Sequence, residues 1–152
     1  MTVTIEHYQA PEFITADDPR LREYSALGGL YTSATQTKEV WTVDQLNRHR
    51  QSILPPRLLV ARVEMGQIAG ALSYDDESET DSVYVSWLAV KGRYRGKRRI
   101  GCSLLATLEM IAEHGHKSEV YLDASNSKSA EFYERRGYCR HPEEGCHIKS
   151  LV

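Results

Sequence analysis

The sequence contains no apolar run that approaches the ~20 residues a membrane-spanning helix needs. Its first ten residues lack the basic start and the apolar core of a secretory signal peptide. Cysteine is scarce: Cys102, Cys139 and Cys146 form an odd number without the paired spacing of a disulfide framework. These absences argue against a transmembrane protein and a disulfide scaffold, and they favour a reducing, cytoplasmic setting.

An excess of either charge is also missing. The chain has 19 Lys+Arg against 21 Asp+Glu, a formal net charge of −2. A nucleic-acid binder needs a broad positive surface, so this balance argues against such a partner. The hydrophobic share of 41% and the charged share of 26% are typical of a folded protein. We find no repeat, low-complexity tract or long linker, so the sequence predicts one domain over residues 1–152 with a real core.

Hydrophobic periodicity predicts strands and helices in the order strand, helix, helix, three strands, helix, strand, helix and two strands. The strands are expected near residues 2–8, 57–64, 67–74, 82–90, 118–122, 138–141 and 146–151. This order predicts an α+β fold in which a mixed sheet is flanked by about four helices.

Short local signals set several of the expected boundaries. Asp17-Asp18-Pro19 is a good helix start, and Gly28-Gly29 is expected to end that helix before a loop over Leu30–Val40. Thr42 opens a second helix with a capping box. Met65-Gly66 is expected to turn an antiparallel hairpin.

One stretch, Ser82–Gly115, combines a strand, a basic loop and a helix. Val83–Val90 is almost continuously apolar, β-branched or aromatic, which suits a strand buried on both faces. Arg93–Arg99 then has five cations in seven residues, and apolar residues recur at helical spacing over 100–112. Gly115 is expected to end that helix in the left-handed conformation.

The basic loop at the start of this helix predicts an anion site. A helix N-terminus has unpaired backbone N–H groups and about half a positive charge. Gly96 and Gly101 bracket the turn, and glycine lets an anion approach the backbone closely. Together these features indicate a phosphate or pyrophosphate site. The alternative is a solvated basic helix start.

The same stretch resembles the acetyl-coenzyme A motif of the GNAT acyltransferases. The resemblance rests on Leu88-Ala89-Val90, Tyr94-Arg95-Gly96-Lys97 and Ile100-Gly101-Cys102-Ser103-Leu104-Leu105. The family pattern is Gln/Arg-x-x-Gly-x-Gly/Ala, in which successive backbone amides hold the pyrophosphate of coenzyme A. This sequence departs from the pattern, because Arg95 and Gly101 are one residue further apart and Arg98 or Arg99 replaces the middle glycine.

A second segment, Asn126–Tyr138, is similar to the family's Asn-x-x-Ala/Ser-x-x-aromatic-Tyr-x-x-x-Gly-aromatic pattern. The residues at matching positions are Asn126, Ser129, Tyr133, Gly137 and Tyr138. The two motifs come in the family's order with one strand between them, and the resemblance covers about residues 57–151. The residues it assigns to coenzyme binding are Leu88, Ala89, Val90, Arg95, Gly96, Lys97, Arg98, Arg99, Ile100, Gly101, Cys102, Asn126 and Ser129.

The resemblance implies a GNAT-like N-acyltransferase fold with acetyl-CoA in a gap beside the central strand. It implies transfer of the acetyl group to a primary amine by direct attack on the thioester, with backbone amides near Leu88–Val90 polarising the carbonyl. The match of Tyr133 implies a general acid that protonates the leaving thiolate, whereas without the motif Tyr133 would be an ordinary helix-face aromatic. The family often forms dimers, so a homodimer is possible.

No general base is evident in the sequence. The central strand offers Tyr84, Ser86 and Trp87, and Glu79 and Asp81 lie just before it. A water relay through Ser86 or Tyr84 is one open route for the proton of the amine.

Two other functions stay open beside the acetyltransferase. One is a catalytically silent GNAT-like domain that binds acyl-CoA as a sensor or regulatory module. The other, a nucleic-acid binder that uses the basic loop, is the least favoured because the positive cluster is local. The sequence does not choose among a polyamine, an amino acid, an antibiotic and a protein N-terminus as the acceptor.

Three further patterns are weaker. The acidic run at 75–81 suits a solvated turn better than a site for a cationic substrate. Tyr31, Trp41 and His49 are candidates for an acceptor pocket or for core packing. The last two cysteines and their neighbouring histidines lack a zinc spacing, so no metal is expected.

Overall fold

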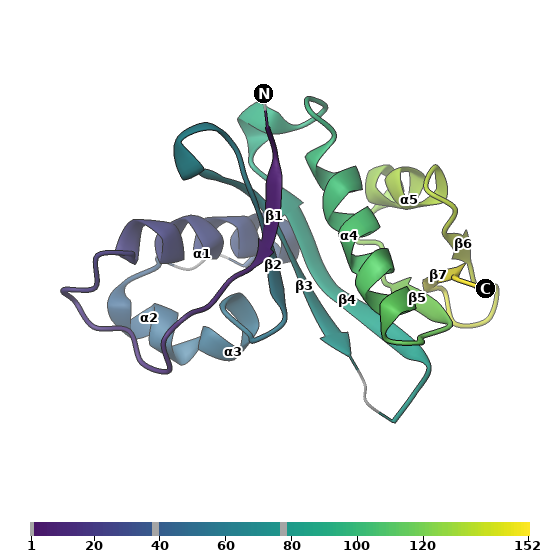
Figure 1. Cartoon of the computed structure of the whole chain (residues 1–152), viewed down its shortest axis with the longest axis horizontal. Coiled ribbons are helices and arrows are strands. Elements are labelled where there is room, and N and C mark those ends of the chain that lie inside the picture. The colour runs from purple at the N-terminus through teal and green to yellow at the C-terminus, as the bar shows by residue number, and fades with distance from the viewer. Residues whose placement is uncertain (1, 38–39, 77–78) are drawn as a thin grey trace. The chain divides into compact units, whose positions relative to one another are not determined.

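A computed structural model describes residues 2–37, 40–76 and 79–152 of the chain (Figure 1). Its internal contacts divide the chain into two units. The first comprises residues up to Ser73 together with Trp87–Leu104, and the second comprises Tyr74–Ser86 and Leu105–Val152. Strand β3 (Ile68–Asp76), strand β4 (Ser82–Val90) and helix α4 (Ile100–His114) each contribute residues to both units.

Antiparallel strands form the sheet of the first unit. Strand β1 (Thr4–His7) pairs with β2 (Leu58–Arg62), and β2 pairs with β3 (Ile68–Asp76). Met65 and Gly66, which connect β2 to β3, have φ angles of 62° and 73°. Two successive left-handed residues are what a tight hairpin turn requires, so the predicted hairpin is confirmed.

The first unit also holds α1 (Leu21–Thr35), α2 (Val43–Arg48) and α3 (Arg50–Ile53). Thr42 caps α2, because its side chain accepts a hydrogen bond from the backbone N–H of Gln45 at 3.2 Å. The predicted capping box is incomplete: Gln45 Oε1 has no hydrogen-bond partner among the described residues, and the N–H of Thr42 donates to the carbonyl of Val40 instead. The single helix expected here is two short helices that meet at His49. The described residues therefore form five α-helices, one more than expected.

The expected end of the first helix is wrong. Helix α1 runs through Gly28 and Gly29 to Thr35, and Gln36 ends it in the left-handed conformation with φ 59°. The predicted loop over Leu30–Val40 is therefore helical for its first half, and residues 38–39 lie outside the described residues. The glycines are tolerated inside the helix because Gly28 is a packing position: a Cβ there would lie 2.7 Å from Cγ of Trp41.

Strand β4 is also less buried than expected. Val83, Val85, Trp87 and Ala89 are buried, and every residue between them is half-buried or exposed. The prediction of burial on both faces is wrong, because apolar residues such as Leu88 also stand on the more open face. Trp87 and Ala89 complete the core of the first unit, and Trp87 donates a hydrogen bond from Nε1 to the carbonyl of Ser52 at 2.9 Å.

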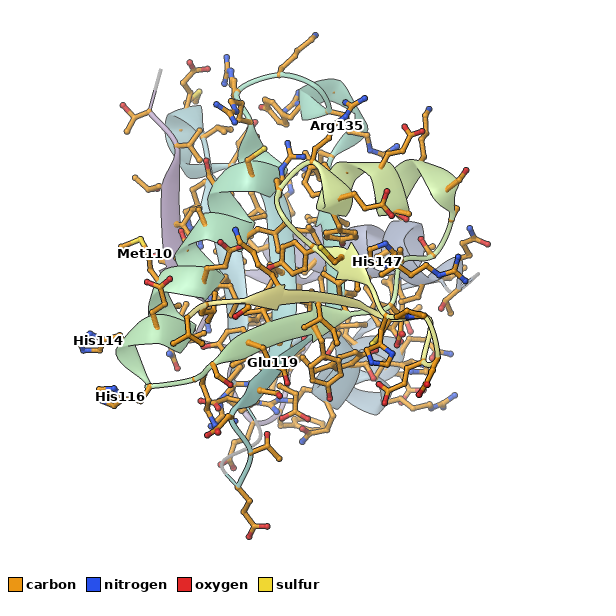
Figure 2. The ribbon with its side chains drawn as sticks, turned by 90° about the vertical axis from the view of Figure 1, so that its right-hand side faces the viewer. Met110, His114, His116, Glu119, Arg135 and His147 are labelled. Carbon is orange, nitrogen blue, oxygen red and sulfur yellow. The ribbon has the colours of Figure 1, made fainter. Side chains whose placement is uncertain are left out.

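The second unit contains the parallel pair that makes the sheet mixed. Residues Ser82–Val85 of β4 pair in parallel with β5 (Glu119–Leu122). Strand β5 pairs antiparallel with β7 (His147–Ser150), and β7 pairs antiparallel with β6 (Cys139–Arg140). Figure 2 labels Glu119 on β5 and His147 on β7. These pairings confirm the α+β fold with a mixed sheet and the C-terminal hairpin.

Helix α5 (Ser127–Glu134) follows β5 and begins at a capping box. The helix ends at Glu134, and Gly137, three residues later, has a φ of 92°. The turn expected at 75–81 includes residues 77–78, which lie outside the described residues. None of the helices in the described part of the chain is long and apolar enough to cross a membrane.

The C-terminus of α4 ends differently from the prediction. The left-handed residue is His116, with φ 60°, and not Gly115. The N–H of His116 donates to the carbonyl of Glu113 at 3.0 Å, and the N–H of Lys117 donates to the carbonyl of Ala112 at 2.9 Å. These two bonds form a Schellman motif in which His116 occupies the position that favours glycine.

Replacing His116 with glycine is expected to raise the free energy of unfolding by about 1 kcal/mol, because the left-handed conformation costs other L-residues roughly 1–2 kcal/mol. The imidazole is exposed and points away from the ribbon (Figure 2). Gly115→Ala is the matched control. Its Cβ would meet the carbonyls of Ile111 and Ala112 at ordinary distances of 3.5 and 3.6 Å, so no loss is expected. Urea unfolding measures both variants, and a clear loss in Gly115→Ala would contradict this assignment.

Candidate functional site

The loop between β4 and α4 has an unusual backbone. A short 3-10 turn (Gly92–Tyr94) leads into residues 95–99, in which Gly96, Arg98 and Arg99 have φ angles of 71°, 61° and 53°. Arginine rarely adopts this conformation, which costs L-residues roughly 1–2 kcal/mol each. Two successive left-handed arginines show where the chain accommodates the longer spacing and the missing glycine that the sequence revealed.

Backbone N–H groups without partners gather in this loop. In the first hydrogen bond of helix α4, the N–H of Ser103 donates to the carbonyl of Arg99 at 2.9 Å. Within the described residues, no acceptor bonds the backbone N–H of Gly96, Arg98, Arg99, Ile100 or Gly101. A Cβ at Gly96 would meet nothing within 4 Å, so the backbone is open there. The loop therefore offers several donors at the positive end of the α4 dipole, which suits a phosphate group.

Arg95 is held by the protein itself. Its Nε donates to the carbonyl of Val90 at 3.1 Å, and its Nη2 donates to Oγ of Ser33 on α1 at 2.9 Å. The guanidinium therefore fixes the end of β4 and the start of the loop to α1. Arg95 is better placed to position the loop than to bind an anion through its side chain.

The β2–β3 turn holds two more cations of the loop. Arg93 Nη2 donates to Oε1 of Gln67 at 2.6 Å, and Arg98 Nη2 lies 3.7 Å from Oε1 of Glu64. Both guanidiniums also lie over the ring of Tyr94, at 4.9 and 5.6 Å from its centre. The sequence reasoning missed these supports, because nothing in the local pattern links residues 64–67 to residues 93–98.

All five cations of the loop are exposed, and two of them, Lys97 and Arg99, differ from the rest in their contacts. Neither side chain forms an ion pair or a hydrogen bond with any other residue in the described ranges. These two side chains are therefore available to an anion at the loop.

Close packing fixes the first turn of α4 on the sheet of the first unit. A Cβ at Gly70 of β3 would lie 3.0 Å from the carbonyl oxygen of Ala89 and 3.0 Å from Cγ2 of Ile100. A larger residue at position 70 would move either the end of β4 or the start of α4. Gly70 thus belongs to the support of the loop, although a lone glycine within a strand gave no such signal in the sequence.

Asn126 and Ser129 cap α5 through a reciprocal pair of hydrogen bonds. Asn126 Oδ1 accepts from the N–H of Ser129 at 2.9 Å, and Ser129 Oγ accepts from the N–H of Asn126 at 3.1 Å. The capping box accounts for both side chains, so their predicted contact with a coenzyme stays a prediction.

Tyr133 lies one turn further along α5 and is buried, with 8% of its surface exposed. Its ring meets those of Phe132 and Tyr138 edge to face, at 5.2 and 5.9 Å between centres. Burial raises the pKa of Tyr133 to about 12, so the phenol keeps its proton at neutral pH. The hydroxyl forms no hydrogen bond with the other residues that the structure describes. Tyr133 is therefore a buried, protonated donor.

The two sequence motifs lie in different units. Leu88–Val90, Arg95–Arg99 and Ile100–Cys102 belong to the first unit, and Asn126, Ser129 and Tyr133 belong to the second.

The aromatic residues proposed for the acceptor pocket form a cluster in the first unit. Tyr31 contacts Trp41 and Trp87 edge to face at 6.1 and 5.7 Å, and Trp41 contacts His49 at 5.6 Å. Tyr31 and Trp41 are partly buried against the core. Core packing accounts for the cluster, and an acceptor pocket here stays a prediction.

Comparison with known proteins gives one family match and many similar folds. A family model described as the acetyltransferase (GNAT) family matches residues 22–138. No curated protein matches the sequence. Similar solved structures include the PaiA N-acetyltransferase of Thermoplasma acidophilum in complex with coenzyme A, at 18% identity over 99% of both chains and a TM-score of 0.66.

Two other similar structures are acetyltransferases as well. The ribosomal-protein-S18-alanine N-acetyltransferase of Escherichia coli is 14% identical, with 99% of this chain and 95% of that chain covered and a TM-score of 0.66. A GNAT-family acetyltransferase of Staphylococcus aureus is 13% identical, with 99% and 100% covered and a TM-score of 0.70. At these identities the likeness shows the fold.

Proposed function

Because the chain belongs to the acetyltransferase (GNAT) family, we propose that it transfers an acetyl group from acetyl-CoA to a primary amine. The observation that carries this proposal is the loop at the start of α4. Its unpartnered backbone N–H groups, its open backbone at Gly96 and the side chains of Lys97 and Arg99 fit the diphosphate of a coenzyme.

The proposed roles follow from the motif resemblance. With the diphosphate at the loop, the thioester end of acetyl-CoA lies back along β4. Backbone N–H groups near Leu88–Val90 polarise its carbonyl as negative charge develops on the oxygen. The amine nitrogen forms a bond to the carbonyl carbon while the carbon–sulfur bond breaks, and Tyr133 donates a proton to the departing sulfur. The raised pKa of Tyr133 keeps that proton in place until it is needed.

The second candidate is a catalytically silent domain that binds acyl-CoA as a sensor. The observation that favours it is the altered loop, in which two left-handed arginines replace the family's glycine. Both candidates require coenzyme binding, so turnover separates them.

Calorimetric titration of acetyl-CoA, with free pantetheine as the control, tests the coenzyme site. Binding of acetyl-CoA that pantetheine does not reproduce supports a diphosphate site. If neither compound binds, both the acetyltransferase and the silent domain are contradicted. Release of free thiol from acetyl-CoA is then measured with spermidine, lysine, an aminoglycoside and a peptide with a free N-terminus. Binding without turnover of any amine would leave the silent domain as the better reading.

Lys97→Ala is expected to raise the Kd of acetyl-CoA about fivefold, the equivalent of about 1 kcal/mol, without changing that of pantetheine. Arg48→Ala, which removes an exposed cation from the surface of α2, is the charge-matched control and should leave both values unchanged. Arg95→Ala should instead lower the free energy of unfolding by about 1 kcal/mol, because it loses two hydrogen bonds. Equal Kd values for Lys97→Ala and the unmodified chain would show that the anion is held elsewhere.

A further inference from the structure

The more open face of β4 carries a phenol that is tied to a carboxylate on the neighbouring strand. The parallel register places Tyr84 of β4 opposite Tyr121 of β5, with 5.0 Å between ring centres. Tyr84 donates its hydroxyl hydrogen to Oδ2 of Asp123 at 3.1 Å. Asp123 directly follows β5 and is exposed. The pair joins a strand face that the proposed reaction uses to a carboxylate in contact with water.

We propose that Tyr84 and Asp123 together accept the proton that the acceptor amine loses, a role for which the sequence left a water relay through Ser86 or Tyr84 open and did not point to Asp123. The inference rests on the proposed acetyl transfer. It gives Tyr84 a catalytic role and makes Asp123 the final proton acceptor.

The proposed function runs the coenzyme along β4, with its diphosphate at the loop that follows the C-terminal end of the strand and its acyl end back toward Ser86. Along this one strand, Tyr84 comes next. Residues on one face of a strand recur every second position, about 6.6 Å apart. Leu88, Ser86 and Tyr84 therefore follow one another along one face, and an amine that attacks the carbonyl from beyond the thioester meets Tyr84 next.

Tyr84 needs Asp123 in order to act. Burial, and after it the hydrogen bond and the charge of Asp123, raise the pKa of Tyr84, so the phenol is protonated at neutral pH. A protonated phenol accepts a proton at its oxygen only if its own proton leaves at the same time. The hydrogen bond to Asp123 provides the path for that departure.

The protons of the step balance. The acceptor starts as an ammonium ion, and its first proton moves to Oη of Tyr84, directly or through one water. The Tyr84 proton moves to Oδ2 of Asp123, which is exposed and returns it to solvent. The free amine nitrogen then bonds the carbonyl carbon, the carbon–sulfur bond breaks, and the nitrogen releases its second proton to solvent. Tyr133 supplies the proton that the thiolate gains and recovers it from solvent after release of the thiol. The net products are the amide, free coenzyme A and one proton.

Other titratable groups surround the pair and bear on any pH profile. Tyr121 faces Tyr84 from β5. From the segment before β7, Cys146 and Glu144 lie near Asp123: partial burial and then the charges of Glu144 and Asp123 raise the pKa of the Cys146 thiol. The pH dependence of kcat in each variant must therefore be compared with that of the unmodified chain.

Asp123→Asn and Tyr84→Phe are each expected to lower kcat about 10²-fold at pH 7, within the range of general acid–base catalysis. The double variant should lose no more than either single variant, because both residues serve one path. The deficit should shrink as the pH rises toward the pKa of the amine, since the free amine then needs no base. The Kd of acetyl-CoA should not change.

Glu119→Gln is the matched control. Ser82 on β4 donates to Oε1 of Glu119 on β5 at 2.7 Å, so this variant weakens a hydrogen bond between the same two strands. Its kcat should stay near that of the unmodified chain. If Asp123→Asn folds poorly, Tyr84→Phe still provides the test, because it keeps the ring against Tyr121.

Three results would overturn the inference: an unchanged kcat in both variants, a loss of equal factor at every pH, or an equal loss in Glu119→Gln. If the unmodified chain acetylates no amine, the proposed function itself fails, and the inference fails with it.

Discussion

Tyr133→Phe is expected to lower kcat by about 10²–10⁴-fold while leaving the Kd of acetyl-CoA and the stability of the fold nearly unchanged. Phenylalanine keeps the edge-to-face contacts with Phe132 and Tyr138 but cannot give a proton to the leaving thiolate. The substitution removes a hydroxyl that forms no hydrogen bond within the described residues, so the free energy of unfolding should move by less than about 0.5 kcal/mol. Steady-state kinetics and urea unfolding of one preparation measure both quantities.

Tyr138→Phe is the matched control and should behave in the opposite way. The Tyr138 hydroxyl donates to Oε2 of Glu109 at 2.9 Å, and Lys149 Nζ lies 2.8 Å from the other oxygen of that carboxylate. Removing the Tyr138 hydroxyl leaves the Glu109 carboxylate without one of its partners. The free energy of unfolding should therefore fall by about 1–2 kcal/mol, and kcat should stay near its original value. If Tyr133→Phe kept full activity, the leaving thiolate would have to take its proton from another donor.

Gly28→Ala is expected to lower the free energy of unfolding by about 2 kcal/mol, although alanine is the better helix former. The added Cβ would lie 2.7 Å from Cγ and 2.9 Å from both Cδ atoms of Trp41, so the indole must move. Trp41 is itself anchored, because its Nε1 donates to Oγ1 of Thr32 at 2.9 Å. Urea unfolding of the variant measures the loss.

The neighbouring glycine supplies the control. A Cβ at Gly29 would meet nothing within 4 Å, so Gly29→Ala should raise the free energy of unfolding by about 1 kcal/mol through helix propensity alone. In a Trp41→Ala background, the effect of Gly28→Ala on the free energy of unfolding should change sign. The substitution should then raise that free energy by about 1 kcal/mol. The same loss in both backgrounds would show that the indole is not the cause.

Local signals predicted the elements that depend on a few adjacent residues. Thr42 caps its helix and Met65-Gly66 turns its hairpin as expected, because each needs only neighbours within four positions. Gly28, Gly29 and Gly115 misled the prediction for the opposite reason. A glycine ends a helix only where the backbone turns left-handed, and the packing of Trp41 on Gly28 comes from a residue thirteen positions away.

In the candidate site, too, features set by adjacent residues were predicted and contacts between distant residues were not. The motif resemblance singled out the loop and Tyr133, and their roles stay predictions. The contacts of Arg95 with Ser33 and of Arg98 with Glu64 join residues that are far apart in sequence, so no local pattern could reveal them. The same is true of Tyr84 and Asp123, which meet only because β4 and β5 pair in parallel.

Two opposing requirements act on the left-handed arginines before α4: a relaxed backbone favours glycine, and a positive charge favours arginine. Glycine at position 99 would relax the backbone, since arginine there pays roughly 1–2 kcal/mol for its φ of 53°. It would also remove an exposed cation beside the unpartnered N–H groups. Under the proposed function, selection for heat resistance would therefore favour glycine at position 99, and selection for coenzyme affinity would favour arginine. A thermostable descendant of this chain would be expected to bind its coenzyme less tightly unless a cation arose elsewhere on the loop.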